Sequence, residues 1–141
     1  METVVLKQIG YIETPYTDYK DTPLCGQGIC ETSIIHIYPE YANCLDRLHK
    51  EQYIFVFSWL DKAERNTHVV HPRRNPENDL QGVFATRSPS RPNPIAYTIL
   101  KLEKIEGTKI YVHGSDLFNN TPVLDIKPYY PPVDNPVYKE Q

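Results

Sequence analysis

The sequence has few of the features that would place a protein in a special class. Its three cysteines are an odd number without the spacing of a disulfide framework, which favours a reducing compartment. No apolar run approaches the roughly 20 residues that a membrane-spanning helix needs. The acidic first residues enter a strand-like pattern at once, unlike a signal peptide. These absences predict a cytoplasmic protein with no membrane partner.

What the sequence has in quantity is proline and tyrosine, with 13 and 11 residues among the 141. This length suits one compact domain over residues 1–141 and is short for two. The net charge of −3 hides an asymmetry, because the stretch 62–95 holds six cations and three acids and so carries +3. Since phosphate contacts depend on local charge, this basic stretch is compatible with an RNA partner as well as with chance clustering.

Short strands dominate the predicted elements. The turn at 106–108 between two apolar runs predicts a hairpin, and the most apolar run, 53–60, predicts a central strand buried on both faces. Pro39 opens a predicted helix that continues to about Lys50. Without alternating strands and helices, the pattern predicts a mainly β fold: a small antiparallel β-barrel with one short helix and long irregular loops. Strands are predicted at 4–12, 33–38, 53–60, 83–86, 97–105, 109–113 and 123–126.

The segment 82–95 is the most unusual part of the chain. A predicted strand leads into Pro89, Pro92 and Pro94, three prolines within six residues. Because proline fixes its own φ and restricts the residue before it, this backbone loses little entropy on ordering. We expect a stiff loop of the kind that a binding site requires, the alternative being a surface loop kept soluble by its arginines. The side chains that this loop presents are Arg87, Ser88, Arg91 and Asn93.

A second polar cluster, at 114–122, follows the predicted hairpin. Asp116 directly follows a strand, where a carboxylate often binds ribose hydroxyls or an amine, although Asx turn chemistry explains it equally well. Asp125 lies between two apolar residues, which favours a structural ion pair, for instance with an arginine of the Pro-rich loop. His68 and His71 have no third ligand beside them, so we predict no metal site.

Together these segments resemble the TsaA-like (TrmO) family of S-adenosylmethionine-dependent methyltransferases. Its characterised member methylates the exocyclic nitrogen of threonylcarbamoyladenosine in tRNA. The resemblance spans nearly the whole chain in the right order, and its central string is long and compositionally odd. The matching residues are Ile9 to Ile12 with Thr14 to Tyr16, Gly82 to Ile95, Asp116-Leu117 and Thr121 to Tyr129.

The resemblance implies a homodimer that binds S-adenosylmethionine near the dimer contact and acts on tRNA. The chain departs from the family at Gly26, where relatives carry arginine, and at Ser58, where they often carry histidine. The cofactor-binding residues implied by the resemblance are Gln27, Ser58, Trp59, Arg87, Tyr97, Asp116, Leu117, Phe118 and Asn119. The residues predicted to bind the substrate come from the basic stretch and are Arg65, Arg73, Arg74, Arg91 and Asn93.

Methyl transfer from a sulfonium is an in-line displacement, so the main task is to align the nucleophile and the methyl carbon at about 3 Å. An amide-like nitrogen must also lose a proton, and Asp116, Asp125 and the histidines are the candidate acceptors, with the choice left open. Two alternatives remain: a methyltransferase for a small metabolite, which the acidic net charge favours, and a non-catalytic S-adenosylmethionine-binding protein.

Overall fold

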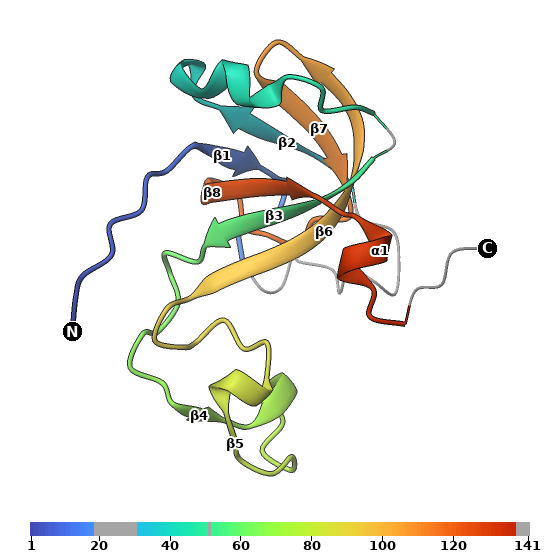
Figure 1. Ribbon diagram of the computed structural model, residues 1–141. Helices are drawn as coiled ribbons and strands as arrows, with labels where there is room; N and C mark the ends of the chain where they lie inside the picture. The colour runs from blue at the N-terminus through green and yellow to red at the C-terminus, as the bar shows by residue number, and fades with distance from the viewer. Residues whose placement is uncertain (19–30, 51, 138–141) are drawn as a thin grey trace.

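The computed structural model of the protein describes residues 1–18, 31–50 and 52–137. Its body is a closed barrel of antiparallel strands in the order β1-β2-β7-β6-β3-β8 (Figure 1). The predicted fold, a small antiparallel β-barrel, is therefore confirmed. The strands are β1 (Gly10–Glu13), β2 (Thr32–Ile37), β3 (Tyr53–Trp59), β6 (Ile95–Glu106), β7 (Lys109–His113) and β8 (Thr121–Pro128).

The predicted central strand is β3, but its burial differs from the prediction. Successive side chains of a strand point to opposite faces, and here Ile54, Val56 and Ser58 are buried inside the barrel while the alternate residues face outward. The expectation of burial on both faces is wrong, because a barrel has one interior and the outer face of β3 remains half-exposed. That outer face is aromatic.

Two predicted elements at the start of the chain are shorter than expected. β1 begins only at Gly10, because the ladders to β2 and β8 start there, and residues 1–8 run away from the barrel (Figure 1). Gly10 is required by a close approach, since a Cβ at this position would lie 2.0 Å from the carbonyl oxygen of His36. The predicted helix from Pro39 is a 3₁₀ helix, η1 (Pro39–Leu45), and Arg47 beyond it adopts a left-handed φ of 66°.

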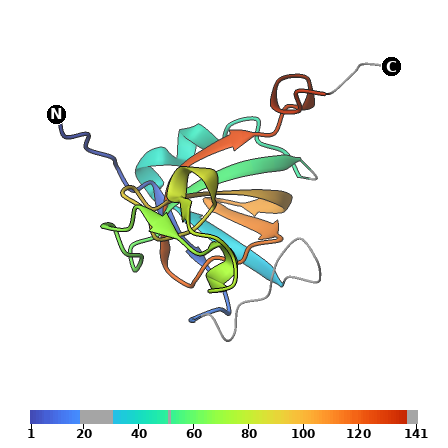
Figure 2. The ribbon, with the colours of Figure 1, turned by 90° about the horizontal axis from the view of Figure 1, so that it is seen from below.

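The irregular stretch between β3 and β6 forms a separate lobe, residues 61–94, which extends from one end of the barrel (Figures 1 and 2). It contains β4 (Val69–Val70), the 3₁₀ helix η2 (Pro72–Arg74) and β5 (Gln81–Gly82), which pairs with β4. The strand predicted at 83–86 is instead the 3₁₀ helix η3 (Val83–Ala85), since the pairing of β5 with β4 already ends at Gly82. The four-residue helix α1 (Pro131–Asp134) lies in the Pro-rich tail, where none was predicted.

The two ends of the barrel differ in chemistry. At one end, η1 and the turn that follows it cover the apolar core with side chains from Tyr41, Leu45 and Leu48. The strand registers gather the buried polar residues toward the opposite end, which we call the polar end. These residues are Thr14, Ser33, Ser58, Ser115 and Thr121. No helix among the described residues is both long and apolar enough to cross a membrane.

Candidate functional site

The connection between β7 and β8 is held in place at the polar end of the barrel. The Thr14 hydroxyl donates to the carbonyl oxygen of Leu117 at 2.8 Å, and the Thr14 amide donates to Asn119 Oδ1 at 3.0 Å. The amide of Asn119 donates to the carbonyl of Tyr16 at 2.7 Å. These long-range bonds order the loop and leave Asp116 as its exposed carboxylate.

The carboxyl group of Asp116 is partly removed from water, although the residue as a whole is exposed. Partial burial of the carboxyl group raises the pKa of Asp116 above its usual range, and a hydrogen bond from its own backbone amide opposes that rise only in part. The charged form loses hydration, and no cation among the described residues compensates for this loss, which is the desolvation case of a perturbed acid. Such a group is a better proton acceptor near neutral pH than an ordinary aspartate.

Ser58 lies at a discontinuity in β3. The pairing of β3 with β8 shifts register between Phe57 and Ser58, and such irregularities re-aim side chains next to binding sites. The Ser58 hydroxyl is fully buried and has no hydrogen-bond partner in the part of the chain that the structure describes. Since an unsatisfied buried hydroxyl is costly, its presence favours a role in binding a polar group.

The end of β3 and the Pro-rich loop are joined by Arg65. Its guanidinium carbon lies 5.0 Å from the centroid of the Trp59 ring, a cation–π contact. The same side chain donates to the carbonyl of Pro92 at 3.0 Å and to Asn93 Oδ1 at 3.3 Å. Trp59, predicted to bind the cofactor, is thus in one cluster with Arg65 and Asn93, both predicted to bind the substrate.

Arg87 connects the lobe to the barrel. Its guanidinium carbon lies 5.1 Å from the centroid of the Tyr97 ring on the outer face of β6. Arg87 also lines a cleft of about 620 Å³ within the lobe, and Arg73 and Arg74 line it as well. The structure therefore brings Arg87 together with Tyr97 on one side and with two predicted substrate residues on the other.

The remaining predicted residues have contacts of other kinds. Leu117 is buried in the core, and Phe118 accepts a 2.7 Å bond from the Thr121 hydroxyl through its carbonyl. Arg91 donates to three carbonyls of its own loop. Gln27, with Cys25 and Gly26 of the same motif, lies outside the described residues.

Two expectations about ionisable residues can be compared with the structure. Asp125 pairs with Lys127 at 3.7 Å, so the suggested partner, an arginine of the Pro-rich loop, is wrong, because Arg91 is engaged within that loop. The His71 ring donates from Nδ1 to the carbonyl of Asn78 at 2.7 Å, an internal bond of the lobe. Within the described residues, no group of three potential metal ligands occurs.

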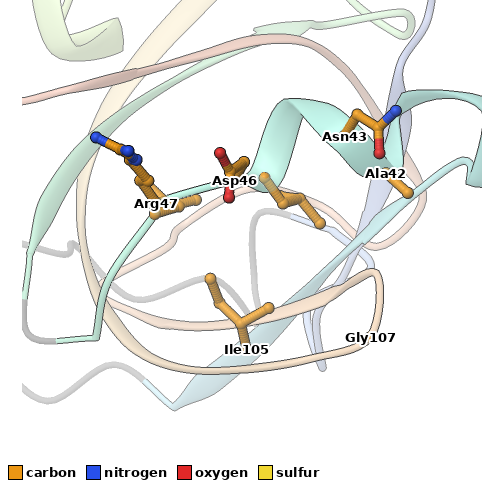
Figure 3. A pocket seen from close by; sticks show the side chains of 8 residues that line it. Ala42, Asn43, Asp46, Arg47, Ile105 and Gly107 are labelled. Atoms are coloured by element: carbon orange, nitrogen blue, oxygen red, sulfur yellow. The ribbon is translucent and has the colours of Figure 1, made fainter.

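A second hollow, of about 570 Å³, lies at the apolar end between η1 and the turn after β6 (Figure 3). Asp46 and Arg47 both line it, so a negative and a positive charge stand next to each other there. It is distant from the lobe, because β6 runs 12 residues from the lobe to this turn. The candidate site is therefore the polar end with its adjoining lobe.

A barrel with ordered polar loops and a stiff arginine-bearing segment at one end has the construction of a small-molecule or nucleic-acid site, and comparison with known proteins narrows the class. The family model described as the tRNA-methyltransferase O N-terminal domain matches residues 11–135. The chain belongs to this TrmO family.

Relatives with assigned names support the same grouping. A probable S-adenosyl-L-methionine-binding protein of Methanothermobacter thermautotrophicus is 39% identical, over 92% of this chain and 93% of its own length. The tRNA (adenine(37)-N6)-methyltransferase of Rattus norvegicus is 37% identical, over 94% of this chain and 32% of its own length. The crystal structure of TrmO from P. aeruginosa matches with a TM-score of 0.77 at 26% identity, over 99% of this chain. The chain spans only 61% of that TrmO chain.

Several residues that shape the site are not singled out by the sequence. Thr14 appears there only as part of a matching string, yet its hydroxyl and amide hold the Asp116 loop. Ser90 and His71 line the cleft of the lobe without having been predicted to do so. The Thr-Pro-Tyr string could have drawn attention to Thr14, but nothing in the sequence gives its partner 103 residues away.

Proposed function

We propose that the chain is an S-adenosylmethionine-dependent methyltransferase of the cytoplasm that methylates the exocyclic nitrogen of threonylcarbamoyladenosine in tRNA. The observation that carries the proposal is the polar end of a TrmO-family barrel, which holds Asp116 and the buried Ser58 hydroxyl, together with the Trp59–Arg65 and Arg87–Tyr97 contacts at the junction of the barrel and the lobe. The rat relative, named as a tRNA methyltransferase, supports the reaction, and the archaeal relatives, named as S-adenosylmethionine-binding proteins, support the cofactor.

The residues of the polar end suit the parts of S-adenosylmethionine, which supplies an electrophilic methyl group when bound. The Ser58 hydroxyl has an unused hydrogen-bonding capacity at a buried position. The Arg87 guanidinium matches a carboxylate by its fork of donors, and Trp59 and Tyr97 offer aromatic surfaces for a ring. Gln27 remains part of this proposed set, with Leu117, Phe118 and Asn119 shaping the loop that presents Asp116.

Asp116 is the proton acceptor in this proposal. Among the other candidates, Asp125 pairs with Lys127, His36 donates to Glu13, and His71 donates to Asn78. Asp116 has no such partner within the described residues, and burial raises its pKa toward the range in which a carboxylate removes a proton effectively. Its role is to accept the proton of the acceptor nitrogen once alignment is achieved.

The proposal includes a homodimer formed by the outer face of β3 and β6. Ile99 and Tyr97 on this face are 48% and 45% exposed, a large share for an isoleucine and a tyrosine on a barrel wall. Phe55 lies between them and Tyr129, 6.2 Å from the ring of Tyr97 and 5.7 Å from that of Tyr129. A second copy on this face would lie beside Arg87. Light scattering tests this: Ile99→Asp should give a monomer, and a dimeric Ile99→Asp protein would contradict it.

The test of the activity is methylation of tRNA in vitro followed by mass spectrometry of its nucleosides. The protein is incubated with S-adenosylmethionine and with tRNA that either carries or lacks threonylcarbamoyladenosine. We expect one methyl group on the modified nucleoside, strongly reduced activity of Arg87→Ala, and wild-type activity of the control Arg47→Ala. Methylation of neither tRNA would contradict the proposed substrate.

A second candidate, a non-catalytic S-adenosylmethionine-binding protein, is favoured by the names of the archaeal relatives, which state binding alone. Calorimetry and turnover separate the two candidates. Binding of S-adenosylmethionine with no methyl transfer to tRNA or to any small metabolite would favour the second candidate. Transfer to a metabolite alone would favour a small-molecule methyltransferase.

A further inference from the structure

The cleft of the lobe has a one-sided charge. It lies between the β4–η2–β5 segment and the residues that follow η3, with a volume of about 620 Å³. Arg73, Arg74 and Arg87 line it, and its lining contains no carboxylate among the described residues. Ser88 and Ser90 add hydroxyl groups to the same wall. The chemistry of this lining fits an anion with several oxygen atoms.

The backbone of η2 places two arginines where glycine would be favoured. Arg73 and Arg74 have φ angles of 56° and 55°, the left-handed region that side chains disfavour. The bend is held by the Asn78 side-chain amide, which donates to the carbonyl of Pro72 at 2.7 Å, and by the amide of Asn75, which donates to the same carbonyl at 3.2 Å. Glycine would be the favoured residue if the bend were the only requirement. Arginine at both positions therefore points to a use for the side chains.

The opposite wall of the cleft is rigid for a different reason. The Arg91 guanidinium donates to the carbonyls of Val83, Thr86 and Ser88 at 2.9, 3.1 and 3.0 Å. The amide of Ser88 donates to the Thr86 hydroxyl at 3.2 Å. Arg91 is thereby a positioning residue that holds the wall, and the guanidinium groups that line the cleft outside the proposed cofactor set are those of Arg73 and Arg74.

We propose that this cleft binds phosphate groups of the RNA backbone that flank the nucleoside to be methylated. The proposal rests on the proposed function, since it takes RNA as the substrate. A guanidinium group binds phosphate oxygens through paired hydrogen bonds, and the bend of η2 brings two of these groups, from Arg73 and Arg74, to one wall of the cleft. Arg87, which also contacts Tyr97, links this phosphate site to the polar end of the barrel.

The experiment compares tRNA binding by the full-length protein and two variants over a range of salt concentrations. The double variant Arg73→Gly/Arg74→Gly removes both charges and fits the left-handed backbone. Arg47→Gly is the matched control, because Arg47 also has a left-handed φ, of 66°, and lines a hollow, but at the other end of the barrel and with Asp46 beside it. Unfolding in urea is measured for each protein, and glycine at these positions is expected to preserve stability.

We expect the double variant to bind tRNA roughly tenfold more weakly, while Arg47→Gly binds like the wild type. The slope of log affinity against log salt should become shallower by about 0.7 for each phosphate that the double variant no longer neutralises. Calorimetry with S-adenosylmethionine should give the same affinity for all three proteins.

Each other outcome overturns a defined part of the proposal. Wild-type tRNA affinity and salt dependence in the double variant would overturn the phosphate site alone. Weaker S-adenosylmethionine affinity with unchanged tRNA binding would identify the anion as the cofactor carboxylate and also overturn it. Absence of tRNA binding by the wild type would overturn the proposed substrate together with the site.

Discussion

The two ends of the barrel use the same strands for different purposes. At the apolar end, the side chains that close the interior are Tyr41, Leu45 and Leu48 of η1 and its following turn, with Ile105 from β6. At the polar end, hydroxyls from Ser33, Ser58 and Thr121 occupy interior positions that hydrocarbon would fill more favourably. Stability is therefore concentrated at one end, and groups suited to binding are concentrated at the other.

The largest expected effect is the loss of stability from a cavity toward the apolar end. Leu102 is fully buried in the core, so Leu102→Ala should lower the free energy of unfolding by about 2 to 5 kcal/mol. Urea denaturation followed by fluorescence measures this change. The affinity of the folded fraction for S-adenosylmethionine should be unchanged. A large loss of affinity would show that the two ends are coupled.

A smaller effect on stability, with an effect on binding, is expected from Thr14→Val. This change keeps the shape of the side chain but leaves the carbonyl of Leu117 and the amide of Tyr16 without the Thr14 hydroxyl, at a cost of about 1 to 3 kcal/mol. The Asp116 loop should loosen, and the affinity for S-adenosylmethionine should fall. Thr14→Ser retains the hydroxyl and should behave like the wild type in both calorimetry and denaturation.

Removal of the Ser58 hydroxyl should lower the affinity for S-adenosylmethionine without lowering the stability of the fold. Ser58→Ala should leave the free energy of unfolding unchanged or raise it by about 1 kcal/mol, because no hydrogen bond is broken. If the hydroxyl contacts the cofactor, affinity should fall by roughly 2- to 10-fold. The control is Ser33→Ala, which removes a second buried hydroxyl without a partner among the described residues, from β2. It should change the free energy of unfolding as Ser58→Ala does and leave the affinity for S-adenosylmethionine unchanged. Equal affinities of Ser58→Ala and wild type would remove Ser58 from the site.

The smallest effect is expected from the pH dependence of Asp116→Asn. Because burial raises the pKa of Asp116 in the folded state, the folded protein binds its proton more tightly than the unfolded chain, whose aspartate titrates near about 4. Stability of the wild type should therefore fall, relative to Asp116→Asn, as the pH rises from about 4 through the raised pKa. Urea midpoints measured from about pH 3 to 7 test this, and curves that stay parallel throughout would contradict it.

The barrel could be predicted from the sequence because the signals for most of its strands are local. β3 and the β6–β7 hairpin follow from apolar runs and a Gly-containing turn, and the structure has them within two residues of the predicted bounds. The strand prediction was wrong at Val4–Gln8 and at 83–86, where the composition favours strands but neither segment pairs with another strand among the described residues. Strand formation depends on neighbours far along the chain, which composition does not reveal.

The candidate site was predictable as a group of residues but not as an arrangement. Arginines and prolines in one string predicted a stiff loop, and in the structure Arg91 donates to three carbonyls of that loop. The sequence did not separate this internal role of Arg91 from the cleft-facing position of Arg73, because both are arginines of a basic stretch. Only the hydrogen bonds make that distinction.

The attachment of the lobe has a consequence for how specificity could change. Its two ends leave the barrel at adjacent positions, since Trp59 pairs with Ile95 and the amide of Leu60 donates to the carbonyl of Pro94 at 2.8 Å. The pairing of β3 with β6 therefore already holds the two ends of the lobe together. Because the entropy of loop closure rises only slowly with length, a longer lobe would add little to the free-energy cost of closure. We therefore expect the lobe to tolerate changes in length while the strands beneath it keep their register.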